Sequence, residues 1–308
     1  MTRWQFPLPS LAGRRAVVTG ASGGLGFDTA AGLAAAGAEV VLAVRNADKG
    51  ELALRRLQAS QPAAKVSVAL VDLARLASVK AFTRRLLDHG QPLDLLINNA
   101  GVMALPQRCV SADGFELQLA TNYLGHYALT AQLLPLLRRA DAPRVVQLSS
   151  LAHRAGRIDF DDLQGERDYR PWRAYRQSKL AMLMFALELQ RRSDAHGWGL
   201  ISHAAHPGWA RTELIANGPA SAGGARGFNL YMALARWLSQ SSAEGALPSL
   251  LAAISDDPGG AYYGPQGLGE VKGPAGHARI ARQALDRQAA VRLWEVSATL
   301  TGSSFLLA

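Results

Sequence analysis

A strand, a glycine-rich turn, a helix and a second strand follow one another near the start of the chain, and this order restricts the fold more than any other feature. The apolar residues 15–19 predict a buried strand, alanine-rich residues to about 36 predict a helix, and residues 39–44 predict the second strand. Gly37 is well placed to end the helix. The unit has about thirty residues, the length of one βαβ unit with parallel strands.

Strands and helices alternate along most of the remaining chain. Further strands are predicted at residues 65–71, 93–97, 144–148, 200–203 and 260–263, and helices at 49–58, 76–89, 121–139, 172–192, 229–239, 243–254 and 281–301. Pro135 is expected to kink or end the helix that contains it. Apolar strands separated by helices are typical of a parallel sheet that is covered on both faces. The sequence therefore predicts an α/β fold, a single doubly wound Rossmann-type domain with a mostly parallel seven-stranded sheet flanked by helices on both faces.

No linker in the chain is long or polar enough to separate two domains. We therefore expect residues 1–308 to form one domain, with residues 1–11 as an N-terminal extension. Residues 215–228 are rich in Gly, Ala and Ser, and residues 208–240 are expected to form a substrate loop or lid.

The chain is basic, with 33 Lys or Arg residues against 24 Asp or Glu and a formal net charge of +9. Such a charge would suit nucleic acid, an anionic membrane surface or a phosphorylated cofactor. Because the basic residues are scattered in pairs along the chain, nucleic-acid binding is not expected. A phosphorylated cofactor stays compatible with this charge.

Membrane insertion, disulfides and metal binding are also not expected. No window reaches the roughly 18 uninterrupted apolar residues of a membrane span, and the first residues do not form a signal peptide. Cys109 is the only cysteine, which excludes an internal disulfide and fits a reducing compartment. No group of His, Cys and carboxylate residues has the spacing of metal ligands. We expect a cytoplasmic protein, and the Ala, Arg and Gly bias suggests a bacterial source.

The turn after the first strand has the composition of a phosphate-binding turn. Its glycines at positions 20, 24 and 26 would let the backbone approach a pyrophosphate, and the helix that follows would supply amide donors. The spacing differs from the commoner G-x-G-x-x-G, and a tight turn without a ligand is the alternative. The strand before and the helix after the turn favour a dinucleotide site.

The end of the second strand indicates which dinucleotide would bind. An acidic residue at this place would take the ribose hydroxyls of NAD, but the sequence is Val44-Arg45-Asn46. The guanidinium of Arg45 could pair with a 2′-phosphate, and no carboxylate opposes it. The alternative is an arginine that simply faces solvent. We predict NADP rather than NAD.

Tyr175 and Lys179 are the strongest candidates for the chemistry. If the predicted helix begins before Tyr175, the two side chains lie one turn apart on the same face. An ammonium at that place would stabilise the tyrosinate and so lower the pKa of the tyrosine. A surface Tyr and Lys on an amphipathic helix would show the same spacing, and only the rest of the chain separates the two interpretations.

Several motifs occur in a fixed order along the chain: Thr19-Gly20-x-x-x-Gly24-x-Gly26, Asn98-Asn99-Ala100-Gly101, Asn122, Ser149-Ser150, Tyr175-x-x-x-Lys179 and Pro207-Gly208. Together they resemble the short-chain dehydrogenase/reductase family over roughly residues 12 to 270. The segments 148–153, 162–166 and 260–265 are similar to the retinol dehydrogenase and WW-domain oxidoreductase branch. In that branch a loop over the active site separates the serine from the tyrosine, which fits the long interval from Ser150 to Tyr175.

The resemblance implies a role for each catalytic residue. Tyr175 would be the general acid and base, and Lys179 would lower its pKa and hold the nicotinamide ribose. Ser150 would donate a hydrogen bond to the substrate oxygen, with Ser149 as its rival. Asn122 would help to place Lys179 through water and complete a proton path.

The resemblance also implies a set of cofactor contacts. Asp72 would contact the adenine, Asn99 to Gly101 would lie behind the nicotinamide, and Pro207 and Thr212 would contact its carboxamide. The full predicted set is Gly20, Ser22, Gly23, Gly24, Leu25, Gly26, Arg45, Asn46, Asp72, Leu73, Asn99, Ala100, Gly101, Tyr175, Lys179, Pro207, Gly208 and Thr212. His153 and His206 also lie near strand ends, where a structural role is the simpler expectation.

The function that follows is NADP(H)-dependent transfer of a hydride between nicotinamide and a carbonyl or alcohol group on an apolar small-molecule substrate. A C=C reductase like the protochlorophyllide reductase relatives is the alternative within the same fold. A cofactor-binding sensor without turnover is the alternative from another class, although the intact Ser, Tyr and Lys argue against it. Relatives often form homodimers or homotetramers through the helices that start near Thr121 and Trp172.

Overall fold

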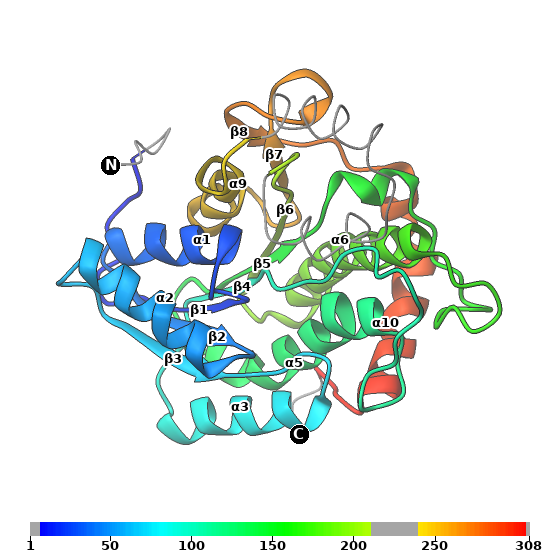
Figure 1. Ribbon diagram of the computed structural model, residues 1–308, viewed down its shortest axis with the longest axis horizontal. Helices are drawn as coiled ribbons and strands as arrows, with labels where there is room; N and C mark the ends of the chain where they lie inside the picture. The colour runs from blue at the N-terminus through cyan, green and yellow to red at the C-terminus, as the bar shows by residue number, and fades with distance from the viewer. Residues whose placement is uncertain (1–6, 211–239, 306–308) are drawn as a thin grey trace.

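The computed structural model describes residues 7–210 and 240–305, and an eight-stranded sheet runs through them (Figure 1). The strand order is β3-β2-β1-β4-β5-β6-β7-β8. All neighbouring strands are parallel except β7 and β8, which are antiparallel. The strand order reverses direction between β1 and β4, and the crevice at such a reversal is where doubly wound sheets bind ligands.

The strands are β1 Arg15–Thr19, β2 Glu39–Val44, β3 Val66–Leu70, β4 Leu95–Asn98, β5 Arg144–Leu148, β6 Ile201–Ala205, β7 Tyr262–Pro265 and β8 Ala275–His277. The predicted doubly wound, mostly parallel α/β fold is confirmed, and β1, β2 and β5 have the predicted bounds. The sheet has eight strands rather than the predicted seven. The missed strand, β8, has only three residues, Ala-Gly-His, so it has none of the apolar run from which the others were predicted.

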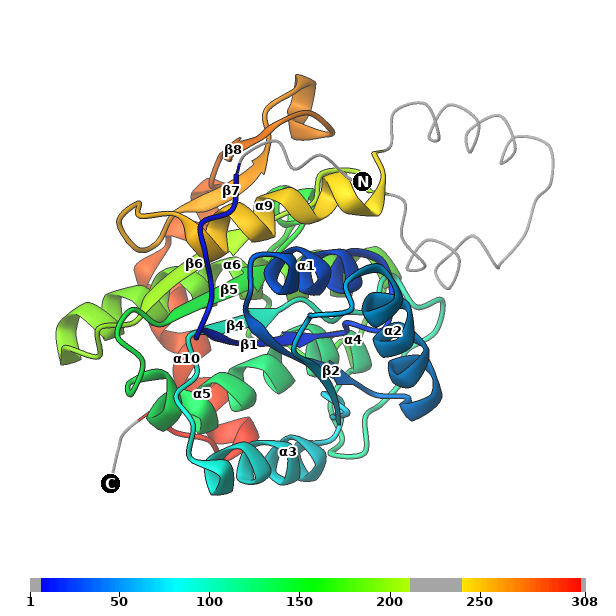
Figure 2. The ribbon, with the colours of Figure 1, turned by 90° about the vertical axis from the view of Figure 1, so that its left-hand side faces the viewer.

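Helices cover both faces of the sheet, as Figure 2 shows. One face carries α1 Gly24–Ala35, α2 Ala47–Ser60 and α9 Ser242–Ile254, whose buried side chains form one core with the sheet. The other face carries α3 Leu76–His89, α5 Gly125–Leu137 and α6 Pro171–His196, which share a second core. Short helical turns complete the fold: α4 Leu117–Leu119, η1 Ala120–Leu124, η2 Leu151–Ala155, η4 Leu268–Glu270 and η5 Arg282–Leu285.

The last helix, α10 Arg287–Thr301, packs against α5 and α6. The ring of Trp294 lies 5.2 Å from that of Tyr127 on α5 and 5.7 Å from that of Phe185 on α6. The sequence predicted one closing helix over residues 281–301, and this was wrong at its start. Asp286 breaks the helix there, because its side chain accepts a hydrogen bond from the Ala289 amide and caps α10.

The predicted helix at residues 121–139 begins earlier and is less regular than expected. Helical structure starts with α4 at Leu117, passes through the π-helical turn η1 and continues as α5 to Leu137, shortly beyond Pro135. π-Helical turns are often found at functional sites. The predicted helix at 229–239 lies outside the described residues.

Candidate active site

The predicted site segments follow four strands that lie side by side in the sheet. The glycine turn follows β1, residues 99–101 follow β4, Ser149 and Ser150 follow β5, and Pro207 and Gly208 follow β6. These strands are parallel neighbours, so their carboxyl ends share one edge of the sheet. The fold therefore brings together residues that are far apart in the sequence.

The glycine turn is held against the segment after β4. The Thr19 hydroxyl accepts hydrogen bonds from the amides of Asn99 and Ala100, at 2.9 and 3.0 Å, and the Asn99 side chain donates to the Thr19 carbonyl at 2.7 Å. A Cβ atom on Gly26 would lie 2.4 Å from the carbonyl oxygen of Gly20 and 2.5 Å from Asn99 Nδ2. Only glycine therefore fits at position 26.

The same turn leaves the first amides of α1 available to a ligand. The residue before the helix is Gly23, which makes no side-chain cap, and the first turn carries no acidic residue. Uncapped amides at a helix N-terminus bind phosphate groups well. These residues therefore fit the pyrophosphate of a dinucleotide.

Tyr175 and Lys179 lie one turn apart on α6, as predicted, and both are buried, with exposures of 6% and 4%. Lys179 Nζ donates to the Leu148 carbonyl at 3.0 Å and lies 5.9 Å from the centre of the Tyr175 ring. The ring of Trp172, one turn earlier, contacts Tyr175 edge-on at 5.9 Å between centroids. The pair is thus fixed between the end of β5 and a partly exposed aromatic side chain.

Burial is the largest influence on the titration of this pair. It raises the pKa of Tyr175, and a hydrogen bond with the Ser150 side chain lowers that pKa in part. Burial also lowers the pKa of Lys179 to about 8, so at neutral pH the side chain is still largely protonated. The sequence predicted that Lys179 lowers the pKa of Tyr175, and in this structure the desolvation of the phenol outweighs such an effect.

The two serines after β5 point to different partners. The Ser149 hydroxyl donates to the carbonyl of Lys179 at 2.7 Å and is therefore directed toward the α6 backbone. The Ser150 hydroxyl accepts from the Ala152 amide at 3.2 Å, and the same side chain lowers the pKa of Tyr175. The two hydroxyls are therefore directed to different groups, and Ser150 stays the predicted serine of the site.

Asn122, in the π-helical turn η1, joins that turn to the segment after β4. Its side chain accepts from the Val102 amide at 2.7 Å and donates to the Val102 carbonyl at 2.9 Å and to Ser178 at 2.8 Å. An added Cβ on Gly101 would lie 3.1 Å from Asn122 Oδ1 and 3.4 Å from Lys179 Nζ. Asn122 and Lys179 therefore meet around Gly101.

The predicted adenosine contacts lie at the ends of β2 and β3. Arg45 is exposed, whereas the Asn46 side chain accepts from the Lys49 amide at 2.9 Å and caps α2. The Asp72 carboxylate accepts from the Ala74 amide at 3.1 Å, and Leu73 is buried. Thr212 lies outside the described residues.

Comparison with known proteins agrees with this geometry. A sequence profile of the short chain dehydrogenase family matches residues 14–221. The chain belongs to the short-chain dehydrogenase family. It is 39% identical to mouse retinol dehydrogenase 11 over 95% of this chain and 87% of that protein, and 39% identical to mouse polyprenol dehydrogenase over 96% and 86%. A crystal structure of an uncharacterised protein from Mycobacterium paratuberculosis is 42% identical, with a TM-score of 0.79 and 97% of each chain covered.

Sequence reasoning missed one buried residue of this short-chain dehydrogenase site. One ring nitrogen of His126 lies 2.9 Å from the Thr19 hydroxyl, and the other lies 2.9 Å from the carbonyl of Asn122. Burial holds the pKa of His126 far below its usual value, to about 3, so the ring is neutral. Within its helix His126 carries no sequence signal, because both partners are set by the fold.

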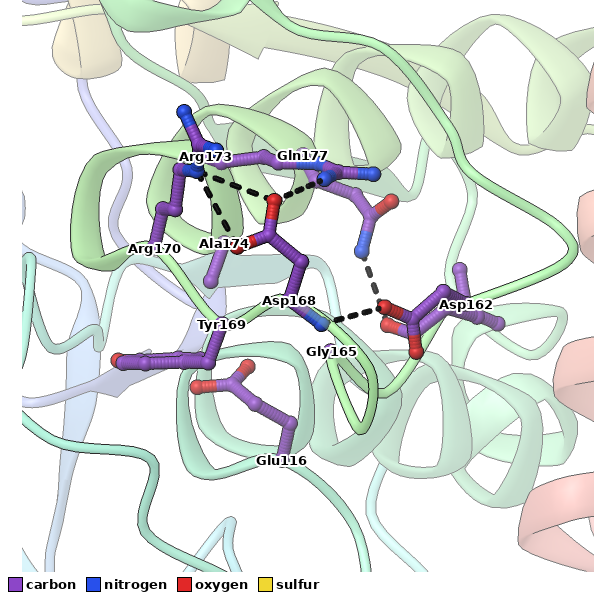
Figure 3. A pocket seen from close by; sticks show the side chains of 10 residues that line it. Glu116, Asp162, Gly165, Asp168, Tyr169, Arg170, Arg173, Ala174 and Gln177 are labelled. Atoms are coloured by element: carbon purple, nitrogen blue, oxygen red, sulfur yellow. Dashed lines mark hydrogen bonds and ion pairs between the residues drawn. The ribbon is translucent and has the colours of Figure 1, made fainter.

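A polar pocket lies beside the first turn of α6, and Figure 3 shows its side chains. Within it Asp168 is paired with Arg170 and Arg173, at 3.0 and 3.4 Å. The Tyr169 hydroxyl donates to the Leu105 carbonyl at 2.8 Å and so ties this loop to the segment after β4. Tyr175 is not among the residues that line the pocket. We therefore interpret the pocket as a neighbour of the candidate site and not as the site itself.

Within residues 7–210 and 240–305, no helix combines the length and apolar character that crossing a bilayer requires. No cluster of His, Cys, Asp and Glu in the same residues could hold a metal ion.

The buried Lys179 predicts an unusual dependence of stability on pH. Its pKa is about 8 in the folded chain, against an ordinary value of 10.5, so the unfolded chain binds this proton more tightly. Below about pH 8 the charge therefore costs the fold on the order of 3 kcal/mol, and the cost disappears as pH rises toward the unfolded value. We expect Lys179→Met to be more stable than the wild type near pH 7 and to lose this advantage by about pH 10.

Urea unfolding of the wild type and of Lys179→Met at the two pH values measures this difference directly. Lys80→Met, at an exposed position on α3, is the matched control and should show no such change between them. A stability difference that is the same at both pH values would contradict the buried-charge account of Lys179.

Proposed function

We propose that this short-chain dehydrogenase transfers a hydride between NADP(H) and a carbonyl or alcohol group on an apolar substrate. The observation that carries the proposal is the buried pair of Tyr175 and Lys179 one turn apart on α6, with the Ser150 side chain close enough to lower the pKa of Tyr175. A phenol and a serine hydroxyl at one point provide a proton donor and a second hydrogen bond for a single oxygen atom. An ammonium behind them favours negative charge on that oxygen.

In the proposed mechanism Tyr175 exchanges a proton with the substrate oxygen. Ser150 stabilises the oxyanion that develops on the same atom, and Lys179 remains protonated at neutral pH. The nicotinamide, when bound, supplies or accepts the hydride. Asn122 holds η1 against the segment after β4 and thereby keeps Lys179 in place. The part of Asn122 in a proton path belongs to the proposal.

The cofactor would lie across the carboxyl ends of β1, β2 and β4. The uncapped N-terminus of α1 supports a pyrophosphate at the glycine turn, where residues 20 and 22–26 would bind it. Asp72 and Leu73 would contact the adenine, residues 99–101 would lie behind the nicotinamide, and Pro207, Gly208 and Thr212 would contact its carboxamide.

The preference for NADP rests on the end of β2. Arg45 is exposed there and free to reach a 2′-phosphate, and the neighbouring Val44 and Asn46 carry no charge that would repel it. The Asn46 side chain caps α2, so of the two predicted contacts Arg45 would make the stronger one.

An apolar alcohol or carbonyl compound is the substrate class that we propose. Trp172 is 44% exposed and lies against Tyr175, so it offers an apolar surface one turn from the reacting group. Retinol dehydrogenase 11 and polyprenol dehydrogenase, which are 39% identical to this chain, are named for alcohols on long apolar chains. The Ser150 side chain beside Tyr175 favours C=O chemistry over C=C reduction, and the intact Ser, Tyr and Lys argue against a sensor without turnover.

The remaining parts of the proposal concern organisation. We treat residues 1–308 as one domain with an extension at 1–11 and a substrate loop at 208–240, most of which lies outside the described residues. Cytoplasmic location and a bacterial source stay predictions from composition. For assembly, we propose a homodimer or homotetramer formed through α5 and α6, each of which α10 already covers in part within the chain.

Tyr175→Phe tests the proposed chemistry. Loss of the hydroxyl should lower the turnover of NADPH with aldehydes and ketones by ~10²–10⁴, while NADPH binds nearly as before, because the phosphate-binding turn is untouched. Tyr263→Phe, which removes a buried hydroxyl bonded to Ser255 on the far side of β7, should keep full turnover. If Tyr175→Phe retains more than about half of the wild-type turnover, Tyr175 is not the acid.

The two serines form their own matched pair of variants. Ser150→Ala should cost more turnover than Ser149→Ala, because the Ser149 hydroxyl is directed to the Lys179 carbonyl while that of Ser150 faces Tyr175. Steady-state rates with a single ketone are sufficient. The opposite ranking would place Ser149 at the substrate.

Arg45→Ala tests the cofactor preference. A charge-assisted contact to phosphate contributes ~1.5–3 kcal/mol, so NADPH should bind about one to two decades more weakly while NADH is nearly unaffected. Arg55→Ala, at an exposed position on α2, is the control. Because Val44 is buried, an acidic residue that favours NADH is best introduced as Arg45→Asp. Equal weakening of both cofactors in Arg45→Ala would remove the basis for NADP.

A further inference from the structure

The connection between β7 and β8 carries a residue in an uncommon backbone conformation. Glu270, at the end of η4, has φ of 60°, in the left-handed region that glycine adopts readily and other residues rarely do. Such a residue persists where its surroundings hold it, and such places are often linked to function. The contacts of Glu270 show what holds it.

The Glu270 carboxylate joins three segments that are distant in the sequence. One oxygen lies 2.6 Å from Nη2 of Arg154 and 3.0 Å from Nε2 of His206. The other accepts from the Arg279 amide at 3.1 Å. The Glu270 side chain is 12% exposed and that of Arg154 is 36% exposed, so the carboxylate is largely buried while the guanidinium still reaches solvent.

The protonation states of this group follow from its hydrogen bonds. His206 Nδ1 accepts from the Gly208 amide at 3.1 Å, so Nε2 carries the proton and donates to Glu270. Burial lowers the pKa of His206, which keeps the ring neutral at pH 7. For Glu270, burial alone would raise the pKa, but the contacts with His206, Arg279 and Arg154 bring it below its usual value. The ionised carboxylate of Glu270 thus accepts from three donor groups.

Two of these donors belong to segments of the proposed active site. Arg154 lies in η2, whose first turn is fixed to Ser150: the Ser150 carbonyl accepts from the amide of His153 at 3.0 Å and from His153 Nδ1 at 2.6 Å. His206 directly precedes Pro207 and Gly208. Glu270 therefore connects the segment of Ser150 with the segment of the proposed carboxamide contact.

The surrounding chain is shaped to accept this arrangement. A Cβ atom on Gly264 in β7 would lie 2.0 Å from His206 Nε2, so the ring occupies the space that a side chain would need. The Trp209 amide donates to the carbonyl of Val271, next to Glu270, at 2.7 Å. The connection between β7 and β8 thus contacts the 206–209 segment at two points, His206 and Trp209.

We propose that Glu270 is a positioning residue for the proposed reaction, and that its carboxylate sets the spacing between Ser150 and the Pro207-Gly208 segment. The inference rests on the proposed function. Glu270 touches neither of the reacting groups, Tyr175 and Ser150. It acts through Arg154 on one side and His206 on the other, and a displacement of about 1 Å in either segment is enough to cost a large factor in rate.

Glu270→Gly is the decisive variant, because glycine accepts the left-handed backbone without strain and removes only the side chain. We expect kcat to fall roughly tenfold to a hundredfold. Glu270→Gln keeps the shape and one acceptor oxygen for His206 or Arg279 but loses the charge opposite Arg154, and it should recover part of the loss. Asp256→Ala is the matched control, since it removes the 2.9 Å ion pair with Arg144 at the opposite edge of the sheet.

Two dissociation constants separate positioning from general damage. NADPH spans the adenosine and nicotinamide ends of the site, whereas 2′,5′-ADP occupies only the adenosine end. Glu270→Gly should weaken NADPH several-fold and leave 2′,5′-ADP unchanged. Should the chain bind NADH instead, NADH and ADP give the same comparison.

If Glu270→Gly keeps the wild-type kcat and the wild-type affinity for NADPH, the inference is overturned. It is also overturned if the variant binds NADPH and 2′,5′-ADP more weakly by the same factor, because that result indicates a disturbed fold. Tyr175→Phe is assayed in parallel. An active Tyr175→Phe refutes the proposed function itself, whereas an inactive one beside a normal Glu270→Gly refutes only the positioning role.

Discussion

The hydroxyl of Thr19 is the contact on which the site depends. It is fully buried at the point where the strand order reverses between β1 and β4, and it accepts the amides of both Asn99 and Ala100. The single proton of this hydroxyl is directed to one ring nitrogen of His126. The other ring nitrogen of His126 donates to the carbonyl of Asn122. One hydroxyl therefore links the glycine turn, the segment after β4 and the π-helical turn that carries Asn122.

Much of the fold and the centre of the site could be predicted because their signals are local. Apolar runs gave the bounds of β1, β2 and β5, and the interval between Tyr175 and Lys179 placed both side chains on one face of α6. The choice of Ser150 over Ser149 rested on the resemblance, because two adjacent serines carry the same local signal. Only the direction of each hydroxyl separates them.

The residues that could not be predicted have partners that are remote in the sequence. Thr19 and His126 are 107 positions apart, and His206 and Glu270 are 64 apart. The sequence gives no sign that His126, inside a helix, or Glu270, in a glycine-rich connection, has a special role. Their partners lie next to them only because the sheet brings distant segments to one edge. The strand β8 was missed for a related reason, since its pairing with β7 rather than its own three residues makes it a strand.

The C-terminal part of the chain supplies the dry surroundings that the site requires. The family profile ends at residue 221, yet Tyr262 packs beside His153 behind Ser150, and Trp294 packs against Phe185 on the helix that carries Tyr175. These aromatic rings exclude water from α6 and from the end of β5. Exclusion of water raises the pKa of Tyr175 and lowers that of Lys179, so it works against the charged form of each side chain. The same exclusion strengthens the attraction between an ammonium and a developing oxyanion. Under the proposed mechanism, the stability that the buried charge of Lys179 costs is offset by a stronger field at the substrate oxygen.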